Sequence, residues 1–228
     1  MWSTDTELFA TARRELFSAV IGDAMDRMGF LHQFLPPAIV PLDRNMILCG
    51  RAMTVLEADF FDEAVEGSHN AITGRPFGLM MDALDDLKTN EVYVCTGSSP
   101  RYALWGELMS VRAMQCGAAG AVVDGYSRDT QGILGLAFPT FSHGSYAQDQ
   151  SPRGKVLDYR IPIQVGDVRV SPEDIIFGDL DGVCVIPKAF EQEVLNEAFE
   201  KARKEKVVRK ALEKGLPAKE AFDRYGIL

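Results

Sequence analysis

The hydrophobic positions near the start of the chain repeat with helical spacing. Between residues 6 and 28, apolar side chains recur every three or four positions, and Gly29 follows them. That period is typical of amphipathic helices, and glycine is a common place for a helix to end. We therefore expect one or two helices here.

The side chains of residues 51–56 instead alternate in the manner of a strand, and some are β-branched. The sheet is therefore expected to begin near residue 47.

The middle of the chain alternates between helical and strand patterns. The sequence predicts a helix over 79–84, a strand over 91–96, a helix that begins near Gly106 and ends at Gly117, and an apolar strand that ends at Asp124. Such alternation is typical of an α/β protein. The following residues, up to position 186, contain short strand patterns separated by turn signals, which predict a mostly β region.

From residue 189 onward the pattern is that of a long amphipathic helix. Apolar positions form a stripe, and the pairs Glu197/Lys201 and Glu200/Lys204 stand four residues apart. A glycine and a proline then separate this helix from a short final one. We therefore expect a single domain over 1–228, in which 188–228 form a helical C-terminal extension.

Composition narrows the class of protein. The 228 residues are 46% hydrophobic and 25% charged, which is typical of a globular chain, and the net charge of -9 disfavours nucleic acid and anionic membranes as partners. No apolar run approaches the roughly 20 residues that span a bilayer, and the first residues lack a signal-peptide pattern. The cysteines have no zinc spacing and are expected to be reduced thiols: Cys49, Cys95, Cys116 and Cys184. We expect a cytoplasmic protein.

The candidate chemistry lies at the turn that follows the apolar strand. The common zinc-protease, P-loop, nucleophile-elbow and dinucleotide motifs are absent from the sequence, and three dispersed histidines do not form an obvious metal site, although His143 is worth examining. Arg128 has a planar fork for a carboxylate or an enolate oxygen, and Asp129 is a ligand for a hard metal ion. These two residues are equally compatible with an ordinary surface ion pair. The helix start near Gly106 adds an anion-binding group of backbone amides, and the two segments could face one ligand.

Five segments together resemble a known family. They are 105–109, 117–125, Arg128-Asp129, 138–139 and 178–187, in the same order and spacing. The chain resembles the RraA-like proteins, which include 4-hydroxy-4-methyl-2-oxoglutarate / 4-carboxy-4-hydroxy-2-oxoadipate aldolases and the regulator of ribonuclease E activity. The resemblance implies an α/β fold of the swivelling β/β/α sandwich type, with N-terminal helices and the C-terminal helical extension. It also implies a homotrimer or a pair of trimers with sites between neighbouring subunits.

The resemblance to aldolase-type members assigns roles to individual residues. It implies a divalent cation, Mg²⁺ or Mn²⁺, held by Asp129 and by waters, with Arg128 in contact with the substrate. It further implies that Glu205, on the C-terminal helix of the adjacent subunit, orients a water that moves the proton. The backbone amides that hold the substrate carboxylate would belong to four consecutive residues, Gly106, Glu107, Leu108 and Met109.

The implied reaction is carbon–carbon cleavage that leaves a pyruvate enolate, or decarboxylation of oxaloacetate, so the expected function is a metal-dependent lyase for a small 2-oxo acid. One departure is that Ile133 and Leu134 stand where aldolase-type members carry a further acidic residue. Another is Glu107, at a position where glycine is common. Three alternatives remain: a regulator that binds a ribonuclease without catalysis, a lyase or dehydratase for another hydroxy or sugar acid, and an oligomeric scaffold with a vestigial site.

Overall fold

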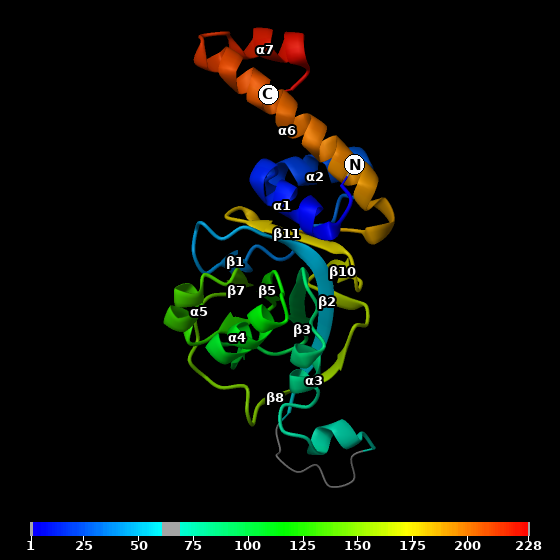
Figure 1. The fold of residues 1–228 in the computed structure, drawn as a ribbon, viewed down its shortest axis with the longest axis vertical. Helices are drawn as coiled ribbons and strands as arrows, with labels where there is room; N and C mark the ends of the chain where they lie inside the picture. Colours follow the sequence, from blue (N-terminus) through cyan, green and yellow to red (C-terminus); the bar gives the residue numbers. More distant parts are fainter. Residues whose placement is uncertain (1, 61–68, 228) are drawn as a thin grey trace.

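The computed structural model of the protein describes residues 2–60 and 69–227. Within these residues, eight strands form one mixed sheet (Figure 1): β1 (Val40–Pro41), β2 (Leu48–Asp59), β3 (Glu91–Thr96), β5 (Gly120–Val123), β7 (Thr140–Ser142), β8 (Gly154–Tyr159), β11 (Ile175–Asp179) and β12 (Gly182–Ile186). Their order is β1-β7-β5-β3-β2-β11-β12, and β8 pairs with the second half of β2.

The central strands β2, β3, β5 and β7 are parallel, and helices connect them. The helices are α3 (Met80–Asp85), α4 (Glu107–Gln115) and α5 (Thr130–Leu136), which lie together on one face of the sheet in Figure 1. Both β3 and β5 are buried along their whole length, as expected for parallel strands covered on both faces. The α/β fold predicted from the sequence is confirmed, and the predicted strand over 91–96 coincides with β3.

Two small two-stranded sheets accompany the main sheet. β9 (Ile163–Val165) and β10 (Val168–Val170) form an antiparallel hairpin, whereas β4 (Ala103–Trp105) and β6 (Tyr126–Ser127) pair in parallel. The hairpin agrees with the mostly β pattern predicted after Asp129. The β4–β6 pair was not predicted from the sequence, and it has a direct consequence for function because Gly106 and Arg128 are the next residues after its two strands.

The terminal helices cover the other face of the sheet. α1 (Asp5–Glu15) and α2 (Ser18–Arg27) pack with α6 (Glu191–Glu213) over β11 and β12, around a buried apolar cluster that includes Phe9, Ile21 and Phe199. Arg51 of β2 fastens this layer, because its guanidinium binds both Asp5 of α1, at 2.8 Å, and Glu191 of α6. The hydrogen bond from Arg51 lowers the pKa of the Asp5 carboxyl.

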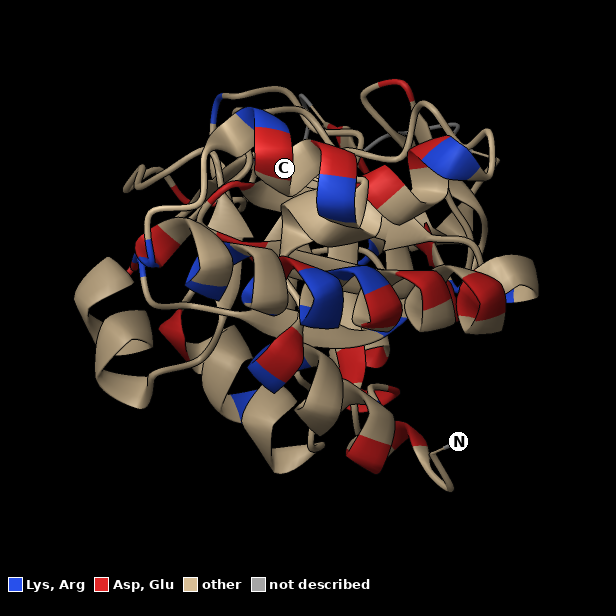
Figure 2. Ribbon diagram, turned by 90° about the horizontal axis from the view of Figure 1, so that it is seen from above, with Lys and Arg blue, Asp and Glu red and all other residues tan. Residues whose placement is uncertain are grey.

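The second half of α6 extends beyond this layer and folds back into α7 (Ala218–Tyr225) (Figure 1). A small apolar cluster of Val208, Ala221 and Ile227 holds the two helices together. Acidic and basic residues are mixed along α6 (Figure 2), and pairs such as Glu200–Lys204 and Arg209–Glu213 stand four residues apart. Two short 3-10 segments, Ala71–Gly74 and Lys188–Phe190, complete the regular structure of the described residues. No helix in these residues is both long and apolar enough to cross a membrane.

Candidate functional site

The parallel β4–β6 pair brings the start of α4 next to the Arg128-Asp129 turn. Trp105 and Ser127 are paired in register, and the backbone N–H of Arg128 donates to the Trp105 carbonyl at 2.8 Å. The next residue of the first segment, Gly106, is the N-cap of α4. A Cβ at Gly106 would lie 3.1 Å from Oδ2 of Asp129 and 3.4 Å from Cγ of Arg128. The two segments singled out in the sequence therefore meet in the structure.

The Asp129 carboxylate does not cap the helix that follows it. Asp129 has a left-handed backbone, with φ of 54° and ψ of 36°, and directly precedes α5, yet its side chain makes no capping hydrogen bond to that helix. Aspartate tolerates this conformation better than most residues, although it costs backbone energy. Oδ2 lies 3.5 Å from Nε of Arg128, and the side chain is 44% exposed. Its carboxylate is therefore accessible to a ligand.

The Arg128 guanidinium lies between two carboxylates. Its Nη1 is 2.8 Å from Oδ1 of Asp149, and its Nε faces Asp129. The side chain is 35% exposed, so part of the fork still faces solvent. Asp149 was not identified from the sequence, because it belongs to an irregular segment without a motif and its partner is distant along the chain.

The first turn of α4 supplies backbone donors next to these side chains. Glu107, Leu108 and Met109 begin the helix, and the amides of a first turn have no acceptor within the helix. The Glu107 carboxylate lies over Gly132 of α5, where a Cβ would be 2.5 Å from Oε2. A side chain at 132 would therefore have to displace the flexible end of Glu107. The Leu108 side chain is 82% exposed, whereas Met109 packs partly against the core.

Glu205 is not part of this group within one chain. It belongs to α6, which lies on the opposite side of the sheet from α4 and α5 (Figure 1), and its carboxylate is 3.8 Å from the Lys201 ammonium. The role expected for Glu205 depends on an adjacent subunit, and it stays a prediction.

A second polar cluster lies at the carboxyl ends of the parallel strands. His143 Nε2 is 3.1 Å from Oδ1 of Asp124, and Thr96 donates to Oδ2 of the same carboxylate at 2.9 Å. The Tyr126 ring meets the His143 ring edge to face, with 5.9 Å between centroids. His143, the histidine noted in the sequence, is thus held by Asp124.

Glu57 is a buried carboxyl at the second half of β2. It is 2% exposed, and burial raises its pKa to about 8 against the hydrogen bonds from Tyr102 and Cys95. One carboxyl oxygen has no hydrogen-bond partner, and neither does the amide nitrogen of buried Gln150. Burial therefore favours the protonated form of Glu57.

The described residues contain no group of three His, Cys, Asp or Glu side chains that could hold a metal ion. A cation at Asp129 would thus be bound by one or two carboxylates and by water, which is how Mg²⁺ is commonly held.

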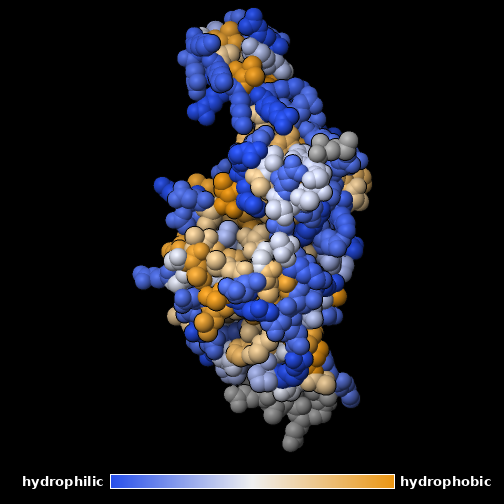
Figure 3. Space-filling model, viewed as in Figure 1, coloured by the Kyte–Doolittle hydropathy of each residue, from blue (hydrophilic) through white to orange (hydrophobic). Residues whose placement is uncertain are grey.

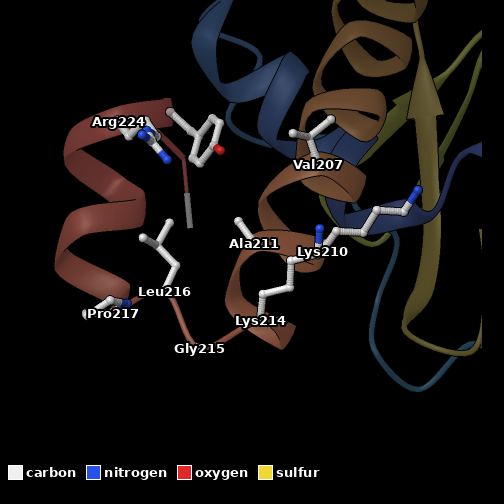
Figure 4. Close-up of a pocket in the computed structure, with 9 residues that line it drawn as sticks. Val207, Lys210, Ala211, Lys214, Gly215, Leu216, Pro217 and Arg224 are labelled. Carbon is white, nitrogen blue, oxygen red and sulfur yellow. The ribbon is translucent and has the colours of Figure 1, made fainter.

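A cavity of about 640 Å³ lies elsewhere, between α6 and α7 (Figure 4). Lys210 and Lys214 line it, but Figure 4 shows that the Lys210 ammonium points away from the cavity.

Comparison with known proteins establishes the family. Residues 18–185 match the family model described as RraA-like, Aldolase/RraA, and the match includes the start of α4, Arg128 and Asp129. The chain belongs to the RraA-like family. The matched region ends before α6, so it does not include Glu205.

The relatives include a protein with an aldolase name and a solved structure of an RraA protein. The chain is 32% identical, over 94% of its length and 93% of the relative's, to a Halalkalibacterium halodurans protein provisionally named 4-hydroxy-4-methyl-2-oxoglutarate aldolase. It is 28% identical over 91% of its length to Legionella pneumophila DlpA, of which it spans only 32%. The chain also resembles the solved structure of Streptomyces coelicolor RraAS2, which is described as an unusual member of the RNase ES inhibitor RraA protein family. The two superpose with a TM-score of 0.76 over 92% of this chain and 99% of that one, and they are 23% identical. That structure supports the fold alone.

Proposed function

We propose that the protein is a lyase that cleaves a carbon–carbon bond in a small 2-oxo acid and releases pyruvate, with Mg²⁺ or Mn²⁺ as its cofactor. The observation that carries this proposal is the contact of Gly106 with both Asp129 and Arg128. It joins an exposed carboxylate, a guanidinium and a helix start in one place. The aldolase name of the Halalkalibacterium halodurans relative supports the same class of reaction.

The residues fit a hard divalent cation. Asp129 offers an exposed carboxylate that its own helix does not use, and Glu107 offers a second carboxylate at the start of α4. Mg²⁺ prefers oxygen ligands and commonly keeps several waters beside one or two carboxylates. Asp129 would hold the ion. A divalent cation bound there would act as a Lewis acid and stabilise negative charge on the keto oxygen of the substrate.

The protein groups bind and orient the substrate around that charge. The amides of Glu107, Leu108 and Met109 would bind its carboxylate, since a helix start attracts anions. The Arg128 guanidinium would donate to the oxygen that becomes an enolate, and this stabilisation grows as the charge develops. In cleavage of a 4-hydroxy-2-oxo acid, the C3–C4 bond breaks and the C4 hydroxyl loses its proton. C4 then leaves as a carbonyl compound, while the bonding pair gives the pyruvate enolate, which takes a proton at C3. Oxaloacetate would give the same enolate and CO₂.

A homo-oligomer would complete the site. Apolar residues are grouped on the surface over α4 and α5 (Figure 3), and the exposed large ones on these two helices are Leu108, Val111, Met114 and Leu134. Exposed apolar groups of this kind are typical of subunit interfaces. We expect a trimer or a pair of trimers, in which Glu205 of a neighbouring subunit orients the water that moves the proton.

A regulator that binds a ribonuclease is the second candidate. The family description covers both aldolases and RraA proteins, and Ile133 and Leu134 replace an expected acidic residue.

One experiment separates the lyase from the regulator. Purified protein is incubated with oxaloacetate and a panel of 4-hydroxy-2-oxo acids, with Mg²⁺ or with a chelator, and pyruvate is measured. Release that needs the metal supports the lyase. No release from any substrate, together with inhibition of a ribonuclease, supports the regulator.

A further inference from the structure

Asp149 fixes the outer end of the Arg128 side chain. Its Oδ1 lies 2.8 Å from Nη1 of Arg128, while the inner part of the same side chain, at Cγ, faces Gly106. Arg128 thus connects the start of α4 to Asp149. A ligand anchored by its carboxylate at the start of α4 and extended along Arg128 would have its far end directed towards Asp149.

The backbone around Asp149 is held in place on both sides. Before it, the Tyr146 N–H donates to the Ser127 carbonyl at 2.8 Å, and the Ala103 N–H donates to the Gln148 carbonyl at 2.8 Å. After it, the Arg153 guanidinium donates to the Asp149 carbonyl at 3.1 Å. The first two bonds tie the segment to β6 and to β4, the strands that precede Arg128 and Gly106, and the third lies within the segment. The backbone that carries Asp149 is therefore fixed relative to Arg128, although the Asp149 side chain is 50% exposed.

The outer end of the Arg128 guanidinium already has a protein carboxylate, that of Asp149, as its partner. Asp129 and Asp149 both face its guanidinium. Arg153, the next cation along this segment, donates to the backbone carbonyls of Asp149 and Ser151. A carboxylate at the far end of a substrate would approach the negative Asp149, whereas a hydroxyl there would donate a hydrogen bond to it.

We propose that Asp149 positions Arg128 and selects 2-oxo acids with a neutral, hydroxylated tail over dicarboxylic ones. This inference rests on the proposed lyase function and specifies its substrate class. The natural substrate is then a monocarboxylic 4-hydroxy-2-oxo acid of the kind formed when a sugar acid loses water.

Two substrates that differ only at the far end test the inference. In 4-hydroxy-2-oxoglutarate the tail ends in a carboxylate, and in 4,5-dihydroxy-2-oxopentanoate it ends in a hydroxymethyl group. Both release pyruvate, with glyoxylate or glycolaldehyde as the second product, so one assay serves for both. The variant Asp149→Asn keeps an oxygen that accepts from Arg128 but removes the charge, while Asp149→Ala removes both. Asp158→Asn is the control, because Asp158 is an exposed aspartate that accepts from the neighbouring Tyr159 N–H.

The wild type should have the higher kcat/KM for the neutral tail. Asp149→Asn should shift the ratio of kcat/KM values towards the dicarboxylate by about fivefold or more, the effect of one like charge at a few ångströms in water. Asp149→Ala should also lower kcat for both substrates, and Asp149→Asn should restore it. The control should leave the ratio unchanged. Pyruvate release with an unchanged ratio in Asp149→Asn overturns this inference but not the lyase, whereas absence of pyruvate from both substrates overturns both.

Discussion

Gly106 and Asp129 are in such close contact that a single methyl group at Gly106 would lie 3.1 Å from the Asp129 carboxylate. The backbone of Gly106 is extended, with φ of -152°, so an alanine is free of backbone strain there. Gly106→Ala should therefore preserve the fold while it shifts the Asp129 carboxylate by a few tenths of an ångström and places a methyl group against the Arg128 stem. We expect turnover to fall by roughly 10- to 100-fold, as for other small displacements of reacting groups.

Gly135→Ala is the matched control for that variant. Gly135 lies in α5, close to the same site, and a Cβ there would meet nothing within 4 Å. Steady-state pyruvate release should show near-normal activity in Gly135→Ala, and thermal unfolding should show no loss of stability in either protein, since alanine favours the helix at position 135. Equal activity of the two variants would contradict the importance of the Gly106–Asp129 contact.

Arg128→Lys tests whether the guanidinium fork is required. An ammonium group cannot donate to Asp149 and to a substrate oxygen with the same planar geometry. We expect kcat/KM to fall by about 100-fold, comparable with the loss of one hydrogen-bond donor to a developing oxyanion. Arg112→Lys, at an exposed arginine of α4 that pairs with Asp85, should have little effect. Similar kinetics for the two variants would argue against a substrate contact by Arg128.

Glu57 should make the stability of the protein depend on pH. Burial raises its pKa from an ordinary 4.5 to about 8, so the folded state holds this proton more tightly than the unfolded chain does. The contribution of this carboxyl is fully present below about pH 4.5 and is lost as the pH rises towards 8. Denaturant unfolding should show a free energy that falls over this interval by at most about 1.4 kcal/mol per pH unit from this group.

In Glu57→Gln, which cannot ionise, the curve of stability against pH should be flatter over the same interval. Glu220→Gln, at an exposed residue of α7, should reproduce the wild-type curve. If the wild type and Glu57→Gln had parallel curves, the protonated state assigned to Glu57 would be wrong.

Mixed oligomers test the proposed role of Glu205. Asp129→Ala and Glu205→Gln should each be inactive or nearly so. If the site combines Asp129 from one subunit with Glu205 from the next, unfolding and refolding the two variants together should restore a fraction of sites with both native residues. Pyruvate release should then exceed the sum of the separate variants. Glu213→Gln, another glutamate of α6, should be active alone. A mixture no more active than its components would place Glu205 outside the site.

The longer strands and helices were predictable because their patterns are local. Residues 91–96 form an apolar run before a loop, and the strand has those bounds. The helix α5 was missed because Gly132 and Gly135 lower its local helix propensity, while tertiary contacts such as the packing of Glu107 on Gly132 favour it. The β4–β6 pair was missed because strands of two and three residues have no detectable period.

The candidate site was only partly predictable for the same reason. Arg128, Asp129 and the start of α4 stand out as residue types in a recognisable local order. The left-handed backbone of Asp129 and the ion pair of Arg128 with Asp149 depend on contacts between distant segments, which no local pattern encodes. Glu205 lies on α6, outside the region that matches the family. Within one chain, α6 and the helices α4 and α5 lie on opposite sides of the sheet (Figure 1), so Glu205 could reach the site only from another subunit.

The central claim is that Asp129 holds a divalent cation beside a bound 2-oxo acid. Crystals of the wild type and of Asp129→Asn, soaked in Mn²⁺ and pyruvate, test it most directly through the anomalous signal of the metal. The wild type should show a peak at coordination distance from the Asp129 carboxylate, with pyruvate between the metal and the start of α4, and Asp129→Asn should show neither at that place. A wild-type crystal with no metal at Asp129, or a peak that persists unchanged in Asp129→Asn, would contradict the account.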